Sequence, residues 1–153
     1  MPVNSTLVSE FNRVSGNAVT PLRNLDFGDP ESSRMLVLQL LMIQEEVNEL
    51  TEAVTSCDRV GIVDALGDIL YVAYGAGYRL GVNLDEAVEE IHRSNMTKFV
   101  ATEAAAVEAV KALQGKYPEA AYRPSCGLWC VYDGATGKIL KPPSYSPPNL
   151  GSY

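Results

Sequence analysis

Apolar residues recur at helical spacing along most of the chain. They stand at steps of three and four in residues 3–14 and again in a long segment that opens at Asp29 and Pro30. An aspartate can cap free backbone amides there, and proline suits the first helical turn. Residues 35–43 are apolar nearly all round, which indicates neighbours on several sides or a subunit interface. The stripe that predicts a packed helix consists of Leu36, Leu40, Ile43, Val47, Leu50 and Val54.

Three further helices are predicted after this one. The first is capped by Asp58 and ends before Gly81, which stands where a left-handed residue is expected. Another begins at Asn83, and a last one is alanine-rich and amphipathic. The predicted ranges are 61–80, then 83 to between 93 and 98, and 102–115.

The C-terminal part changes from helical to strand-like patterning. The runs LWCVY and KIL flank residues 133–137, whose glycines and aspartate suit a tight reversal, so we predict a small β-hairpin there. The last segment, PPSYSPPNLGSY, is proline-rich and is predicted to be extended. The pattern therefore predicts a mainly α fold: a helical bundle with a small C-terminal β-hairpin and an extended tail.

Length and composition fit one globular domain over residues 1–153. A chain of 153 residues with 46% hydrophobic content can bury one core. A formal charge of −7 disfavours a nucleic-acid-binding surface, because phosphate backbones are held by clustered Lys and Arg. No run of about 18 uncharged apolar residues and no signal-peptide pattern is present, so we expect no membrane partner and a cytoplasmic location, either bacterial or in a phage-infected host.

Five acidic residues stand on two consecutive predicted helices. Glu45, Glu46 and Glu49 form an E-E-x-x-E group, in which Glu45 and Glu49 share one face and Glu46 lies about 100° round the helix. Asp64 and Asp68 stand four residues apart in a run that is otherwise uncharged. Hard oxygen ligands of this kind predict two or three Mg²⁺ or Mn²⁺ ions between antiparallel helices, and they argue against zinc.

The same carboxylates also fit two interpretations that need no metal. The three glutamates alone suit a solvated acidic face, since glutamate is a good helix former. The two aspartates could pair with Arg34, Arg59 or Arg79. Two unpaired like charges on a largely buried helix would cost several kcal/mol, however, and a shared divalent cation would satisfy both. A metal site is therefore favoured over either alternative.

A few polar residues outside the acidic group are candidates for binding a substrate. Asn95 and Lys98 fall one helical turn apart at a helix end, which suits sugar hydroxyls or phosphate oxygens. Lys138 and Lys141 flank the second predicted strand and could reach phosphates, although exposed lysines commonly serve only solubility. The single histidine, His92, is interpreted as a packing residue rather than a base.

Four motifs in order carry a resemblance to a known family. The segments are EEVNEL, CDRVGIVDALGDILYVAYGAGYRLGVNL, HRSNMTKF and DGATGKILKPPSYSPPNL, and the resemblance that they carry runs from about Phe11 to Leu150. Together they resemble the phosphoribosyl-ATP-pyrophosphohydrolase-like branch of the all-α MazG superfamily of nucleoside triphosphate pyrophosphohydrolases. The compact length and the segment SNMTKF are similar to MazZ-type members of phages, which remove dGTP or related purine nucleotides.

The resemblance implies hydrolysis of a (deoxy)nucleoside triphosphate to the monophosphate and pyrophosphate, with dGTP or GTP preferred, by a homodimer or homotetramer. Many relatives carry E-x-x-D as their second acidic motif, whereas Ala65 stands here in place of the glutamate and Asp64 is the nearby carboxylate. The implied ligands of Mg²⁺ or Mn²⁺ are Glu45, Glu46, Glu49, Asp64 and Asp68. The implied substrate-binding residues are Asn12, which stands where relatives often have histidine, and Asn95, Lys98, Lys138, Lys141 and Tyr145.

Glu46 is predicted to be the general base, because its displacement from the face of Glu45 and Glu49 leaves it free to reach a water. Two other functions stay open. One is a phosphoribosyl-ATP pyrophosphohydrolase of histidine biosynthesis, which performs the same chemistry on a bulkier nucleotide. The other is a non-catalytic helical scaffold that binds cations to stabilise its oligomer. Pyrophosphate release separates the enzymes from the scaffold.

Overall fold

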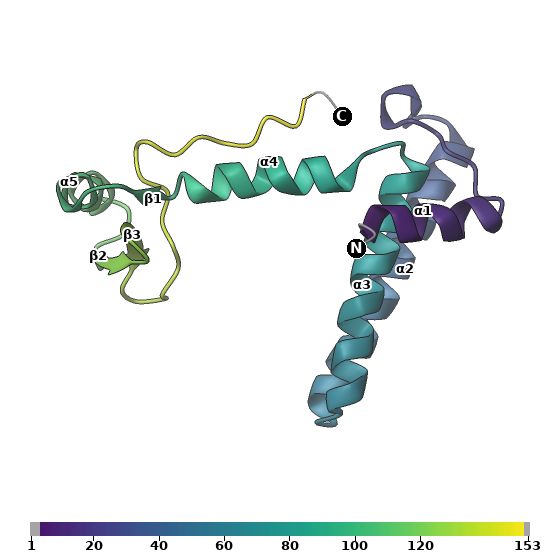
Figure 1. The fold of residues 1–153 in the computed structure, drawn as a ribbon, viewed down its shortest axis with the longest axis horizontal. Coiled ribbons are helices and arrows are strands. Elements are labelled where there is room, and N and C mark those ends of the chain that lie inside the picture. The colour runs from purple at the N-terminus through teal and green to yellow at the C-terminus, as the bar shows by residue number, and fades with distance from the viewer. Residues whose placement is uncertain (1–3, 152–153) are drawn as a thin grey trace. The chain divides into compact units, whose positions relative to one another are not determined.

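A computed structural model describes residues 4–151, which form two compact units that divide between residues 87 and 88. The elements are mainly helices, followed by a small antiparallel sheet and an extended C-terminal segment (Figure 1). The predicted fold class is thereby confirmed. One catalytic domain over residues 1–153 stays a prediction.

The first unit is built from helices α1 (Asn4–Val14), α2 (Pro30–Thr55) and α3 (Arg59–Arg79), with a short 3₁₀ turn at Leu22–Asn24. Both α1 and α2 pack against α3 (Figure 1). The predicted helix starts are confirmed, because Asp29 accepts a hydrogen bond from the Ser32 amide at 2.8 Å and Asp58 caps α3 in the same way.

Small residues let α2 and α3 approach closely where the chain turns between them. A Cβ on Gly61 would lie only 3.1 Å from the Cβ of Ala53, so a larger side chain would push the helices apart. Ala53 and Ala65 are both buried. The tight connection makes α2 and α3 an antiparallel hairpin whose two arms stay in contact.

The apolar stripe predicted as the core face of α2 is divided in the structure. Leu36, Ile43 and Leu50, seven residues apart, are partly buried. The other members, also seven apart, are exposed: Leu40 by 64%, Val47 by 38% and Val54 by 55%. The pattern predicted a helix packed along this stripe, and within the single chain this holds only for the side that α3 covers. We call Leu40, Val47 and Val54 the open seam.

The first unit buries little apolar surface of its own. Its buried hydrophobic residues are Val8 and small alanines, whereas large side chains on α3, among them Leu66 and Leu70, are exposed. Within residues 4–151, α3 is the one helix that is long and apolar enough to cross a membrane, a test that core helices of soluble proteins also pass. Asp64 and Asp68 interrupt the apolar surface of this helix.

The second unit begins within helix α4 (Leu84–Met96) and contains β1 (Phe99–Val100), α5 (Glu103–Leu113), β2 (Ala120–Ser125) and β3 (Leu128–Asp133). The strands form an antiparallel sheet in the order β1-β3-β2, and α5 packs against it. A hydrophobic core fills the space between helix and sheet. It consists of Val100, Ala106, Ala109, Val110, Val131 and Leu140.

The hairpin lies one strand earlier than the sequence pattern predicted. The run LWCVY forms β3, but its main partner is β2, and the predicted partner KIL makes only a bridge between Ile139 and Tyr132. The reversal uses Cys126 and Gly127, with φ of 49° and 80°, which is the geometry of a tight two-residue hairpin turn. Cysteine is not a residue that signals positive φ, so this turn was missed.

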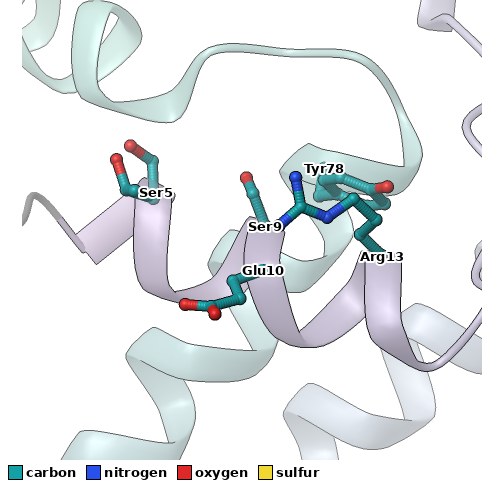
Figure 2. A pocket seen from close by; sticks show the side chains of 6 residues that line it. Ser5, Ser9, Glu10, Arg13 and Tyr78 are labelled. Atoms are coloured by element: carbon teal, nitrogen blue, oxygen red, sulfur yellow. The ribbon is translucent and has the colours of Figure 1, made fainter.

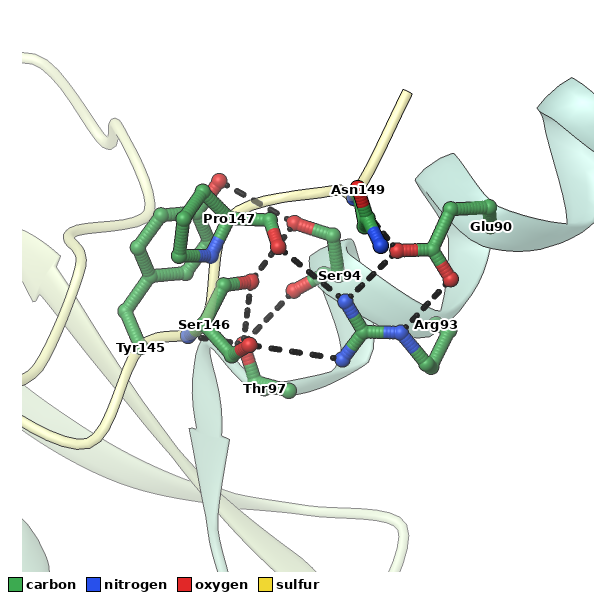
Figure 3. Close-up of polar contacts among 8 residues, drawn as sticks. All are labelled: Glu90, Arg93, Ser94, Thr97, Tyr145, Ser146, Pro147 and Asn149. Carbon is green, nitrogen blue, oxygen red and sulfur yellow. Dashed lines mark hydrogen bonds and ion pairs between the residues drawn. The ribbon is translucent and has the colours of Figure 1, made fainter. Parts of the chain in front are cut away.

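The C-terminal segment is held along α4 by a polar cluster (Figure 3). The Asn149 amide donates to Glu90 at 2.6 Å, and the Ser94 hydroxyl donates to the Ser146 carbonyl at 2.8 Å. Arg93 and the Asn149 amide lower the pKa of Glu90 to about 2. The predicted extended course is confirmed over residues 145–150, after a turn at 143–144, and these contacts fix it. The last two residues of the predicted tail, 152 and 153, lie outside the described range.

Candidate active site

The five carboxylates predicted to bind metal lie at the same height on the α2–α3 hairpin. Glu45, Glu46 and Glu49 belong to the C-terminal half of α2, and Asp64 and Asp68 to the N-terminal half of α3. The chain reverses between the helices at residues 56–58, so both groups lie at similar distances from the turn. The antiparallel packing therefore places the two acidic groups beside each other.

The negative charges of the neighbouring carboxylates affect the pKa of Glu46. Glu46 is half-buried, whereas the other four carboxylates are exposed. Its pKa is raised above the ordinary value, first by burial and then by the negative charges of Glu49, Asp68, Glu45 and Asp64. Contributions come from both helices. The negative charges of both helices thus act on Glu46.

No cation of the chain neutralises this acidic group within residues 4–151. None of the five carboxylates forms a salt bridge or accepts a side-chain or cap hydrogen bond there. The alternative pairing with arginine is not observed. Arg79, for example, has a buried Nε without a partner, and its Nη1 lies 3.5 Å from Asn17. No salt bridge among the described residues offsets the repulsion at Glu46.

The donor chemistry of this group fits a divalent cation of the Mg²⁺ or Mn²⁺ type, because all five donors are carboxylates and their charges are unpaired. Their side chains are spread apart as they stand. In the described part of the chain, no three Asp, Glu, His or Cys residues converge closely enough to hold an ion. Mutual repulsion between exposed like charges favours this spread arrangement.

The structure shows the surroundings of Ala65, which stands where many relatives carry the glutamate of the E-x-x-D motif. Ala65 is buried with 3% exposure, whereas Asp64 is exposed. A glutamate at position 65 would carry its stem from this buried point, while Asp64 starts about 100° further round α3. That Asp64 takes over the role of the missing glutamate stays a prediction.

The electrostatic cost at Glu46 leads to a stability prediction. A raised pKa in the folded state means that ionised Glu46 costs stability above the unfolded value near 4.5, and that this cost disappears at lower pH. Glu46→Gln should therefore raise the melting temperature of metal-free protein by a few degrees at pH 7, and the gain should vanish towards pH 4. Differential scanning calorimetry measures both.

Glu52→Gln is the matched control, since Glu52 is exposed on the same helix and does not contribute to the shift at Glu46. It should leave the melting temperature unchanged. Added Mg²⁺ should stabilise the wild-type chain more than Glu46→Gln. An unchanged or lower melting temperature for Glu46→Gln at pH 7 without metal would contradict the repulsion.

Asn12 is buried, and both ends of its side-chain amide are engaged. Its Nδ2 donates to the Val8 carbonyl at 2.9 Å, and its Oδ1 accepts from Asn17 Nδ2 at 2.9 Å. It packs beside Gly75 of α3, where a Cβ would lie 3.6 Å from its amide nitrogen. These contacts seat α1 on α3. A contact with substrate stays a prediction for this residue.

The remaining predicted substrate-binding residues lie in the second unit. Lys98 Nζ donates to Asn95 Oδ1 at 2.7 Å, so the pair spaced one turn apart is in contact. The Lys141 ammonium lies over the ring of Tyr145, 4.5 Å from its centroid. Lys138 and Lys141 line a cavity together with Lys98. The structure thus brings the three lysines together around one cavity, and Asn95 and Tyr145 each contact one of them.

Sequence reasoning missed the cation and the aromatic ring that line this cavity after α5, Lys116 and Tyr117. It also missed the apolar wall of Leu113, Ile139 and Leu140. Lys116 and Tyr117 follow α5, in a segment to which the residue pattern assigned no role. The available signal was the distribution of charge, because all five lysines of the chain lie between residues 98 and 141. Proximity between Lys116 and Lys98 depends on the fold of the second unit, which the spacing of residues alone did not predict.

A second cavity, of about 480 Å³, lies beside α1 in the first unit (Figure 2). The hydroxyl of Ser9 and the guanidinium of Arg13 point to the same side of α1, and the carboxylate of Glu10 points away from them (Figure 2). This cavity is lined by Ser5, Thr6, Ser9, Glu10, Arg13 and Tyr78.

A comparison with known protein families matches the part of the chain that contains the acidic residues of α2 and α3. Residues 29–95, which include α2 and α3, match the family model described as phosphoribosyl-ATP pyrophosphohydrolase. The chain is also 40% identical over 98 residues to an uncharacterised protein of Acanthamoeba polyphaga mimivirus. That alignment covers 63% of this chain and 39% of the viral protein, so the chain spans about two-fifths of that relative's length. The resemblance inferred from the motifs is confirmed over residues 29–95.

Proposed function

We propose, from the premise that residues 29–95 match the phosphoribosyl-ATP pyrophosphohydrolase family, that the chain is a metal-dependent nucleoside triphosphate pyrophosphohydrolase. It converts a (deoxy)nucleoside triphosphate and water into the monophosphate and pyrophosphate. The family match supports pyrophosphohydrolase chemistry. The preference for dGTP or GTP that we propose rests on the likeness of the segment SNMTKF to MazZ-type enzymes of phages.

One observation supports the metal-dependent chemistry most directly: the pKa of Glu46 is raised by burial and by four neighbouring carboxylates. An acidic group of this kind would repel a triphosphate, and no Lys or Arg of residues 4–151 pairs with it. Divalent cations held by these carboxylates would reverse the local charge. A triphosphate could then enter a site that is otherwise repellent.

In the proposed reaction, Glu46 is the base. A water oxygen bonds to the α phosphorus, its proton passes to the Glu46 carboxylate, and the bond from the α phosphorus to the bridging oxygen breaks as pyrophosphate leaves. The raised pKa suits this role, since a base works best when its pKa is nearer to the working pH. When bound, Mg²⁺ or Mn²⁺ supplies charge neutralisation to the phosphates and increases the acidity of the attacking water.

The other predicted metal ligands and the polar residues have separate roles in this proposal. Glu45, Glu49, Asp64 and Asp68 would hold two or three cations. The Asn95–Lys98 pair binds sugar hydroxyls or phosphate oxygens, and Lys138, Lys141 and Tyr145 bind the phosphates. In this proposal, Asn12 also contacts the substrate.

We also propose that the chain functions as a homodimer or homotetramer. The first unit leaves Leu40, Val47 and Val54 exposed on α2 and Leu66 and Leu70 exposed on α3. Monomeric soluble proteins rarely leave apolar residues exposed in such continuous runs. A second copy of this chain would complete the core that the first unit lacks.

A screen of the purified chain tests the proposal. Every ribo- and deoxynucleoside triphosphate is incubated with Mg²⁺ or Mn²⁺, and monophosphate, pyrophosphate and inorganic phosphate are quantified separately. We expect equal amounts of monophosphate and pyrophosphate, fastest with dGTP or GTP, and none in the presence of EDTA. Release of inorganic phosphate without pyrophosphate would show a phosphatase and reject the reaction proposed.

The same screen includes phosphoribosyl-ATP, because the matched family model carries that substrate in its description. Faster turnover of phosphoribosyl-ATP than of any triphosphate would assign the chain to the second enzyme. If no nucleotide yields pyrophosphate while Mg²⁺ still raises the melting temperature, the carboxylates serve a cation-binding scaffold instead.

A further inference from the structure

The second unit contains a cavity whose walls are unusually rich in lysine. It has a volume of about 320 Å³ and lies beside the C-terminal end of α5. Segments far apart in the sequence meet there: the end of α4, the turn after α5, and the stretch after β3. Its lining residues are Lys98, Leu113, Lys116, Tyr117, Lys138, Ile139, Leu140 and Lys141.

The lysine content of this cavity is out of proportion to the rest of the chain. The chain has a formal charge of −7 and only five lysines, four of which line the cavity. The fifth, Lys111, forms an ion pair with Glu108 at 2.8 Å. Within residues 4–151, none of the four cavity lysines forms a salt bridge. Their positive charges are therefore available to a ligand.

Neutral neighbours hold several of these ammonium groups in place. Lys116 Nζ lies 5.5 Å from the centroid of the Tyr117 ring, and Lys141 Nζ lies 4.5 Å from that of Tyr145. Lys98 Nζ donates to the Asn95 amide oxygen. Aromatic faces and an amide orient a cation without neutralising its charge. These three lysines of the cavity therefore have neutral partners and keep their positive charge.

The charge of these lysines contributes to a lower pKa of a neighbouring phenol, that of Tyr145. The pKa of Tyr145 is lowered, first by the hydrogen bond with Ser94 and, among weaker causes, by the positive charges of Lys141 and Lys98. Burial acts in the opposite direction and does not overcome these effects. The positive charges of Lys141 and Lys98 thus favour the anionic form of this neighbouring group.

We propose that this cavity binds the phosphate groups of a phosphorylated ligand, and that Lys116, on the segment after α5, is one of the residues that hold them. The inference rests on the proposed function for the identity of that ligand, pyrophosphate or the phosphates of a nucleotide. It gives the segment that follows α5 a role, which is to complete a phosphate site that Lys98, Lys138 and Lys141 begin.

The shape of the cavity favours a small phosphorylated molecule over a nucleic acid. A volume near 320 Å³ is at the lower end for small-molecule sites, and Leu113, Ile139 and Leu140 supply an apolar wall. A nucleic-acid surface would need basic residues spread over a longer path, and the chain as a whole is acidic. Four ammonium groups around one small space instead match the charge of pyrophosphate.

Isothermal titration calorimetry of the full chain in EDTA tests this inference without turnover. Pyrophosphate is titrated into the wild-type chain, Lys116→Ala and Lys111→Ala. We expect Lys116→Ala to weaken binding roughly tenfold, since one charge-assisted contact is lost. Lys111→Ala removes the same charge from the same segment but outside the cavity, and it should change the affinity by less than about twofold.

A parallel titration with dGMP distinguishes the source of the phosphate. Tighter binding of pyrophosphate assigns the cavity to the polyphosphate end, and tighter binding of dGMP assigns it to the nucleotide product. Equal effects of Lys116→Ala and Lys111→Ala, or no pyrophosphate binding by the wild-type chain at millimolar concentration, would overturn the inference. Absence of pyrophosphate release from every nucleotide would instead reject the proposed function, while the binding result would stand.

Discussion

Asp68→Asn is expected to reduce pyrophosphate release from the preferred nucleotide roughly a thousandfold, with Mg²⁺ at a saturating concentration. Asp68 is the α3 carboxylate that contributes most to the shift at Glu46, after burial and Glu49. Asparagine keeps the shape of the side chain but removes the charge that a divalent cation requires. Charge stabilisation by a metal ion contributes several kcal/mol, and each 1.4 kcal/mol is about a factor of ten in rate.

The melting temperature separates loss of catalysis from loss of the fold. Asp68 is exposed and forms no salt bridge in the described part of the chain, so Asp68→Asn should keep or slightly raise the melting temperature without metal. Glu52→Gln, an exposed carboxylate of α2 outside the acidic group, should keep full turnover. Turnover within about threefold of wild type for Asp68→Asn would remove Asp68 from the metal site and with it the α3 half of the proposal.

The helices could be predicted because their ends carry local signals. Asp29 and Asp58 cap their helices through hydrogen bonds to amides two or three residues on, and Gly81 has a φ of 63°, as its position after a helix indicated. These features depend only on neighbours in sequence. The same holds for Thr102, which caps α5 and accepts a hydrogen bond from the Ala105 amide.

The strand pairing could not be predicted in the same way. Strand β2 has the sequence AAYRPS, in which a proline and two alanines give a weak strand signal. Its pairing with β3 is set by the turn at Cys126 and Gly127 and by the core beneath, where Tyr122 and Trp129 pack 5.6 Å apart. Pairing energy of this kind comes from contacts across the sheet, which a single strand does not reveal.

The two parts of the candidate site differ in the same way, because one depends on local spacing and the other on packing. The five carboxylates are found from spacing alone, since i, i+4 pairs on two consecutive helices must lie near a common level when the helices form a hairpin. The lysine cavity joins residues 98, 116 and 138–141, and only the packing of α5 on the sheet brings them together. Spacing therefore predicted which carboxylates lie on the two arms of the hairpin, and their binding of metal stays a prediction. It predicted the basic cavity only in part.

Replacing both Leu40 and Val47 with glutamate is expected to dissociate the oligomer. These residues of the open seam lie seven apart on α2 and are exposed by 64% and 38% in the single chain. Burying such a side chain stabilises by about 1.5 kcal/mol or more, so two positions in each of two copies give about 6 kcal/mol. The dissociation constant should rise roughly ten-thousandfold, as sedimentation equilibrium measures.

Asn48→Glu combined with Thr55→Glu is the matched control, because it adds the same two charges at the same spacing of seven to exposed polar positions of α2. It should keep the mass of the wild-type assembly. The seam variant should also unfold at a lower temperature, because the buried hydrophobic residues that the structure describes in the first unit are Val8 and alanines, and a second copy is needed to complete its core. A wild-type chain that is monomeric at micromolar concentration, or a seam variant with unchanged mass and melting temperature, would show that the open seam is not a subunit interface.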